Sequence, residues 1–83
     1  LHNWPGMPIG QFAVKPGPIM AAFDIFEIEI TGRGSHAAKP HISVDPIVIA
    51  SQIVSSLQTL VSRNLDPIDQ GVVSVTQISA GDT

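Results

Sequence analysis

The feature that most constrains the fold is a change of hydrophobic period between two neighbouring segments. Apolar and polar side chains alternate along residues 23–31, with Phe26, Ile28 and Ile30 on one face and Glu27, Glu29 and Thr31 on the other. Along residues 46–63, apolar side chains instead recur every three or four positions. The first pattern predicts a strand with one buried and one solvated face, and the second predicts an amphipathic helix.

The predicted helix has clear start and stop signals. Asp45 is a good N-cap, and Pro46 falls at the first helical position, where a missing N–H is harmless. The predicted apolar stripe contains Ile47, Ala50, Ile53, Val54, Leu57, Leu60 and Val61. The opposite face holds small uncharged polar residues, which favours contact with a partner there. Residues 72–80 alternate again and predict a second strand, so the unit is β–α–β.

The loop between the first strand and the helix contains the side chains best suited to catalysis or ligand binding. Its sequence is Gly32-Arg33-Gly34-Ser35-His36-Ala37-Ala38-Lys39-Pro40-His41. The two glycines predict a backbone turn where a β-carbon would clash, and the two alanines leave room beside an imidazole. A histidine on such a tip can titrate, donate a hydrogen bond or bind a metal. From the residues alone, a solvated or locally bonded His36 is the favoured interpretation.

The first 22 residues predict mostly irregular structure. Residues 1–8 contain two prolines and predict a loop, and Lys15-Pro16-Gly17 predicts the turn of a small hairpin. Residues 20–22 are interpreted as a hinge. His2 is a single histidine in this region, and a metal site needs three or four converging ligands.

Composition narrows the class of protein. The chain has 83 residues, of which 43% are hydrophobic and 13% charged, so disorder is not expected. Its net charge is −3 and its four basic residues are scattered, which argues against a nucleic-acid partner. No apolar run approaches the ~20 residues of a spanning helix, so no membrane partner is expected. The chain has no cysteine and begins with Leu, and we expect it to be a piece of a larger protein.

Several motifs together resemble the aminoacylase/carboxypeptidase family of metal-dependent amidohydrolases, in its hippurate hydrolase and N-acyl-amino-acid amidohydrolase branch. The matching stretches are Leu1-His2-Asn3-Trp4-Pro5, residues 10–20 and 24–30, the loop from Gly32 to His41, Asp45-Pro46, Arg63-Asn64-Leu65-Asp66-Pro67, and residues 72–81. They cover nearly the whole chain but only a small part of a full-length family member.

The resemblance implies an α+β fold. Residues 1–21 would be the end of a catalytic-domain segment and a hinge, and residues 22–83 the first half of a dimerisation (lid) domain. That satellite domain is ferredoxin-like, β-α-β-β-α-β, and only its first β-α-β would be present. Its first two strands are parallel and separated by the third, so the sheet would have a gap here.

The resemblance also implies a chemistry. The parent protein would hydrolyse the amide bond of N-acyl amino acids, including hippurate-like substrates, in the cytoplasm. His2 would be one ligand of a two-metal centre, most often zinc, with manganese, cobalt or nickel as alternatives. His36 would stabilise the oxyanion in the partner subunit of a homodimer. His41 would hold the loop by a hydrogen bond, and Arg33 would be a surface charge.

Three interpretations follow from the sequence. The first is a piece of a dimeric amidohydrolase, inactive by itself because most of the metal site lies elsewhere. The second is a purely structural dimerisation module in which His36 has no catalytic role. The third is an unrelated small α+β ligand-binding module.

Overall fold

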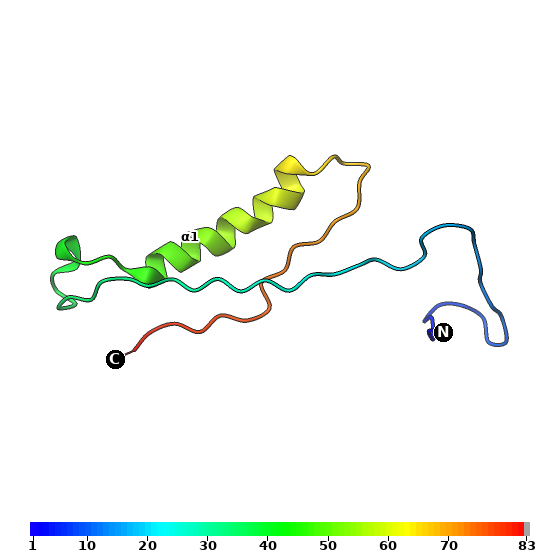
Figure 1. Cartoon of the computed structure of the whole chain (residues 1–83), viewed down its shortest axis with the longest axis horizontal. Helices are drawn as coiled ribbons and strands as arrows, with labels where there is room; N and C mark the ends of the chain where they lie inside the picture. The colour runs from blue at the N-terminus through cyan, green and yellow to red at the C-terminus, as the bar shows by residue number, and fades with distance from the viewer. Residues whose placement is uncertain (83) are drawn as a thin grey trace.

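One long helix dominates the computed structural model, which describes residues 1–82 (Figure 1). A short 3₁₀ turn, η1, spans Pro40–Ile42, the α-helix α1 spans Pro46–Thr59, and a π-helical turn, η2, spans Leu60–Asn64. The helix predicted over residues 46–63 is therefore confirmed, and its last turn is wider than an α-helical turn.

Local hydrogen bonds define both ends of the helical segment. The Asp45 carboxylate accepts hydrogen bonds from the backbone N–H groups of Ile47 at 2.9 Å and Val48 at 3.4 Å, which confirms the predicted N-cap. The chain becomes extended at Leu65. Pro67 prevents the helix from resuming, because it restricts the preceding residue, Asp66, to non-helical conformations. Asp66 then closes a turn by accepting a hydrogen bond from the Ile68 N–H at 3.0 Å.

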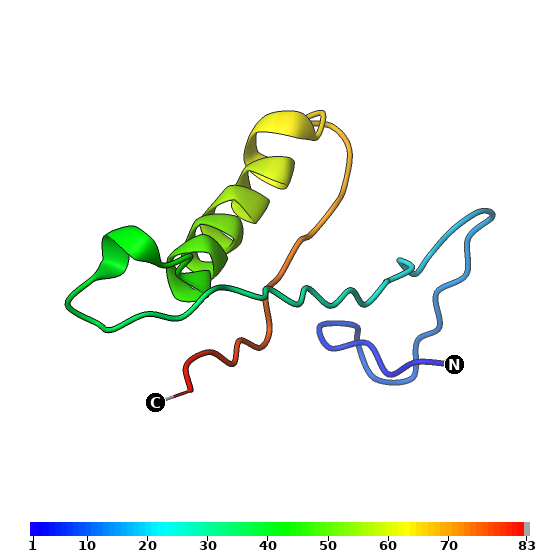
Figure 2. The ribbon, with the colours of Figure 1, turned by 60° about the vertical axis from the view of Figure 1, so that its left-hand side comes forward.

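The two predicted strands run as extended segments on one side of α1 (Figures 1 and 2). Within residues 1–82 no backbone ladder joins residues 23–31 to residues 72–80, and β-pairing is limited to one antiparallel bridge between Arg33 and Val44. A strand is stable only when a neighbour satisfies its N–H and C=O groups. The ferredoxin-like arrangement therefore stays a prediction.

Side-chain exposure agrees with the predicted faces of both extended segments. Ile28 is 52% exposed and Ile30 is half-buried, whereas Ile25 on the other face is 83% exposed. In the last segment Val75 is 37% exposed and Val72 is 88% exposed. A hollow lies between the two segments and the start of α1, lined by Ile28, Ile30, Pro46, Ile47, Ala50 and residues 77–81.

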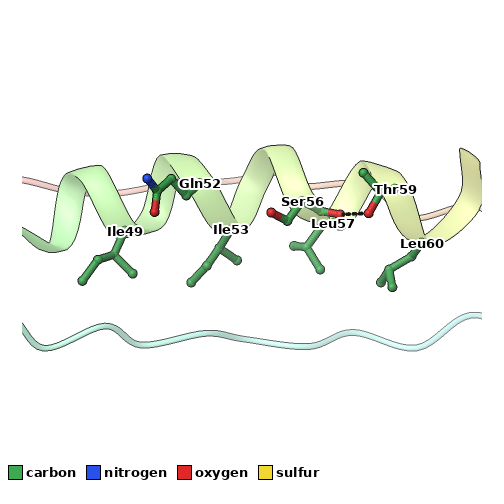
Figure 3. A pocket seen from close by; sticks show the side chains of 7 residues that line it. All are labelled: Ile49, Gln52, Ile53, Ser56, Leu57, Thr59 and Leu60. Atoms are coloured by element: carbon green, nitrogen blue, oxygen red, sulfur yellow. Dashed lines mark hydrogen bonds between the residues drawn. The ribbon is translucent and has the colours of Figure 1, made fainter. Parts of the chain in front are cut away.

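The apolar stripe of α1 is rotated slightly from its predicted position. Its half-buried side chains are Pro46, Ile49, Ala50, Ile53, Val54 and Leu57. Ile47 and Leu60, which were expected within the stripe, are about half exposed at its edges. Ile49, absent from the predicted stripe, projects from the same side as Ile53, Leu57 and Leu60 (Figure 3).

The hairpin predicted around Lys15-Pro16-Gly17 is wrong. Gly17 does make the turn, with a positive φ of 88°. Residues 10–14 and 18–22, however, form no backbone hydrogen bonds with each other in the part of the chain described. Pro18, the first residue of the second arm, lacks the N–H group that pairing there would use, which works against the hairpin.

The molecule is elongated and has no buried interior over residues 1–82. Its extents are 64 × 28 × 18 Å, and its radius of gyration is 20.6 Å, against about 12 Å for a compact domain of this length. Its accessible surface is 8250 Å², against about 4,800 Å² for a folded monomer of this mass. No helix of the described residues has the length and apolar character needed to traverse a lipid bilayer.

Candidate functional site

The loop that carries His36 is closed at its base by a pair of backbone hydrogen bonds. The Arg33 N–H donates to the Val44 carbonyl at 2.9 Å, and the Val44 N–H donates to the Arg33 carbonyl at 3.0 Å. Residues 34–43 project beyond this bridge, at the end of the molecule where α1 begins (Figure 1). The loop is thus held between the end of one extended segment and the N-cap of the helix.

Only one of the two loop glycines is required by close packing. A β-carbon at Gly32 would collide with the Val44 carbonyl oxygen and would lie 2.5 Å from Cδ of Pro46. A β-carbon at Gly34 would meet no atom within 4 Å, and its φ is not in the left-handed region. The prediction that both glycines avoid a clash is therefore right for Gly32 and wrong for Gly34.

The tip of the loop is a hydrogen-bonded turn centred on the two alanines. The Lys39 N–H donates to the His36 carbonyl at 2.7 Å, which closes a four-residue turn over Ala37 and Ala38. The Ser35 hydroxyl donates to the Lys39 carbonyl at 3.0 Å, and the Ser43 hydroxyl donates to the Pro40 carbonyl at 2.8 Å. The backbone of the tip is therefore fixed by its own side chains.

The His36 side chain is exposed, and one of its two ring nitrogens is already bonded. The Ala38 N–H donates to His36 Nδ1 at 3.0 Å. Within residues 1–82 the other nitrogen, Nε2, has no hydrogen-bond partner. The ring is thus tethered at Nδ1, and Nε2 of this exposed residue is left available to another molecule.

The expectation for His41 turns out differently, whereas Arg33 is exposed as expected of a surface charge. His41 was expected to hold the loop, but its ring makes no hydrogen bond to any described residue, and Ser35 and Ser43 hold the loop instead. Sequence analysis overlooked both serines, although serine hydroxyls commonly bond nearby backbone groups in turns. Arg33 is exposed, and its backbone closes the loop.

His2 is exposed near the N-terminus, at the opposite end of the long axis from the loop (Figure 1). The structure therefore does not bring the two predicted site residues together within one chain. No group of three His, Cys, Asp or Glu side chains gathers anywhere in residues 1–82. A structural or catalytic metal needs at least three protein ligands, so the described residues do not form a metal site by themselves.

Comparison with known proteins gives consistent matches. The sequence pattern of the peptidase dimerisation domain matches residues 24–83. The chain is 51% identical over 81 residues to an N-acetylcysteine deacetylase of Bacillus subtilis (strain 168), covering 98% of this chain and 21% of that protein. It is 46% identical over 83 residues to an N-acetyldiaminopimelate deacetylase of Leuconostoc mesenteroides, covering 100% of this chain and 22% of the relative.

A third relative is an N-acyl-L-amino acid amidohydrolase of Geobacillus stearothermophilus, 46% identical over 80 residues that cover 96% of this chain and 22% of that enzyme. No solved structure matches the chain. The chain spans about a fifth of the length of these curated relatives. From the match over residues 24–83, the chain belongs to the peptidase dimerisation domain family.

Proposed function

We propose that this chain is a segment of a dimeric amidohydrolase that hydrolyses the amide bond of N-acyl amino acids. The relatives named as deacetylases and an amidohydrolase support this substrate class. Hippurate-like substrates fall within it, because hippurate is itself an N-acyl amino acid. The cytoplasmic location expected from the family resemblance stays a prediction.

In this proposal His36 donates a hydrogen bond from Nε2 to the oxyanion that forms when the amide carbonyl is attacked. A donor aimed at that oxygen stabilises the transition state more than the ground state, since negative charge develops only as the reaction proceeds. Support comes from the exposure of His36, the hydrogen-bonded turn that carries it, and an Nε2 that has no partner within residues 1–82.

The observation that carries the proposal is the separation of His2 and His36. They lie at opposite ends of a molecule 64 Å long (Figure 1). If both belong to active sites, each contributes to a different one. A symmetric dimer achieves this by placing the loop of one subunit at the site of the other.

The metal centre enters the proposal only through His2. We assign His2 as one ligand of a site for two divalent metal ions, zinc in most family members, whose remaining ligands lie outside residues 1–82. No chemical step can be derived from the described residues through that centre, because they supply too few ligands.

The polar face of α1 supports dimerisation through this domain. Its hydroxyls donate to carbonyls of their own helix, from Ser51 to Val48 at 2.7 Å. The bond from Thr59 to Ser56, at 2.7 Å, is drawn in Figure 3. Polar groups that are already bonded lose little when water is removed. An uncharged face of this kind can be covered by a partner subunit without leaving a buried charge.

The test is the replacement of His36 in the parent enzyme. We expect His36→Ala to lower kcat by about 10²- to 10³-fold, the effect of losing one oxyanion donor, with KM and bound metal nearly unchanged. His36→Gln, which keeps an N–H donor near the position of Nε2, should retain more activity. A purely structural role of the domain predicts near-normal turnover for both variants, and that result would overturn the assignment.

A further inference from the structure

The hydrogen bond between Ala38 and His36 determines which ring nitrogen carries the proton. The donor is a backbone N–H, so His36 Nδ1 must accept with its lone pair, at 3.0 Å. A neutral imidazole has one N–H nitrogen and one acceptor nitrogen. With Nδ1 as the acceptor, the proton resides on Nε2.

We propose that the Ala38 backbone amide is a positioning group that fixes His36 in the Nε2–H tautomer and so keeps its exposed nitrogen a hydrogen-bond donor. This inference rests on the proposed function, because it specifies how the oxyanion donor is prepared. In free imidazole the proton exchanges between the two nitrogens, so an untethered ring would present an acceptor for part of the time.

The turn supplies the rigidity that this assignment requires. Two bonds hold the turn that contains the amide, from the Lys39 N–H to the His36 carbonyl at 2.7 Å and from the Ser35 hydroxyl to the Lys39 carbonyl at 3.0 Å. Two more, between Arg33 and Val44, close the base of the loop. The donor at Ala38 therefore has little freedom to leave Nδ1.

The same bond allows His36 to act as a hydrogen-bond donor and prevents it from acting as a metal ligand. A metal ligand must offer a lone pair, and in the fixed tautomer the only lone pair is already shared with Ala38. Nε2 can then donate but not ligate. The loop is thus suited to contact a developing negative charge and unsuited to hold a cation.

The experiment measures the tautomer directly in the parent enzyme. Protein labelled with ¹⁵N in histidine is studied by long-range ¹H–¹⁵N correlation at a pH where the ring is neutral, and the His36 signals are identified by their loss in His36→Gln. We expect the proton on Nε2 and an unprotonated Nδ1. A proton on Nδ1, or an averaged mixture, would overturn the inference.

A backbone substitution tests the cause. Replacing Ala38 by L-lactic acid converts its N–H to an ester oxygen and leaves the side chain unchanged. We expect the tautomer signals to become mixed and kcat to fall about two- to tenfold, the effect of one hydrogen bond, with little change in KM. The matched control replaces Ser35 by L-glyceric acid, which keeps the hydroxyl, because neither the Ser35 N–H nor the Gly34 carbonyl has a hydrogen-bond partner among the described residues. Unchanged tautomer signals in the Ala38 ester would refute the proposal.

The two proposals fail in different ways. Full turnover in His36→Ala together with an Nε2–H ring would overturn the catalytic role and leave the tautomer assignment intact. Loss of turnover in His36→Ala together with an Nδ1–H ring would support the catalytic role and overturn the tautomer assignment.

Discussion

At the base of the loop, Gly32 is required because the backbone of Val44 and the ring of Pro46 occupy the space that a side chain would need. We predict that Gly32→Ala in the parent protein lowers the free energy of unfolding by about 1–3 kcal/mol, the usual effect of overpacking. The Arg33–Val44 bridge must open to relieve the collision, so the loop should also lose its fixed position. Urea unfolding followed by turnover assays measures both effects.

Gly34 provides the matched control, two positions along the same loop. An added methyl group there meets open space, so Gly34→Ala should be neutral or slightly stabilising, by up to about 1 kcal/mol, through lower entropy of the unfolded chain. Equal destabilisation by the two substitutions would show that the collision at Gly32 is not what matters.

At the scale of the element, α1 depends on its N-cap. Asp45 accepts two backbone N–H groups that would otherwise have no partner. We predict that Asp45→Ala destabilises the first turn of α1 by about 1 kcal/mol. Amide hydrogen exchange of residues 48–52 in the parent protein should accelerate by about fivefold, the factor that corresponds to that free energy.

The conservative variant isolates the cap from its charge. Asp45→Asn keeps an oxygen acceptor and loses only the favourable interaction of the carboxylate with the helix dipole, a few tenths of a kcal/mol. Its exchange rates should therefore stay near those of the unchanged protein. If Asn and Ala accelerate exchange equally, the charge rather than the capping bond stabilises this end of the helix.

The helix, whose hydrogen bonds are local, was predictable from the sequence, and the pairing of strands, which needs partners farther along the chain, was not. The Asp45-Pro46 start and the apolar spacing predicted α1 because helix hydrogen bonds are local. The outward faces of residues 23–31 followed from alternation alone. Pairing into a sheet depends on a neighbouring strand, so no pattern within the segment could establish it.

For the candidate site, too, some features were predictable from the sequence and others were not. The position of His36 on an exposed loop followed from the glycines and alanines around it. The bond from Ala38 to Nδ1 and the roles of Ser35 and Ser43 depend on the dihedral angles of the turn, which the residue types do not specify. His41 is chemically equivalent to His36, and only the geometry of the loop distinguishes the two.

At the scale of the whole molecule, the exposed apolar surface predicts how the 83-residue chain behaves alone. With 8250 Å² accessible and no buried residue among those described, too little apolar surface is removed from water to offset the entropy of ordering the chain. We predict a radius of gyration by small-angle X-ray scattering of about 20 Å or more, and no cooperative thermal transition. A monomer with a radius near 12 Å and a sharp transition would contradict this prediction.

The opposite placement of His2 and His36 leads to a prediction about mixed dimers. In the parent enzyme, His36→Ala and His2→Ala should each be nearly inactive as homodimers. When the two variants exchange subunits freely, half of the dimers are mixed, and each has one complete site if the loop serves its partner. About one quarter of the normal activity should therefore return. If His36 served its own subunit, no complete site would form and activity would stay at background.

A second mixture tests the same arrangement through a loss of activity instead of a gain. Normal subunits are mixed in equal amounts with a double variant that carries both His2→Ala and His36→Ala. If the loop acts across the interface, neither site of a hybrid dimer is complete. Activity should then fall to about one quarter of the undiluted enzyme, contributed by the remaining normal dimers. A loop acting within its own subunit leaves one complete site in every hybrid, so activity would fall only to about one half. The two mixtures together distinguish the arrangements without knowledge of the metal or of the preferred acyl group.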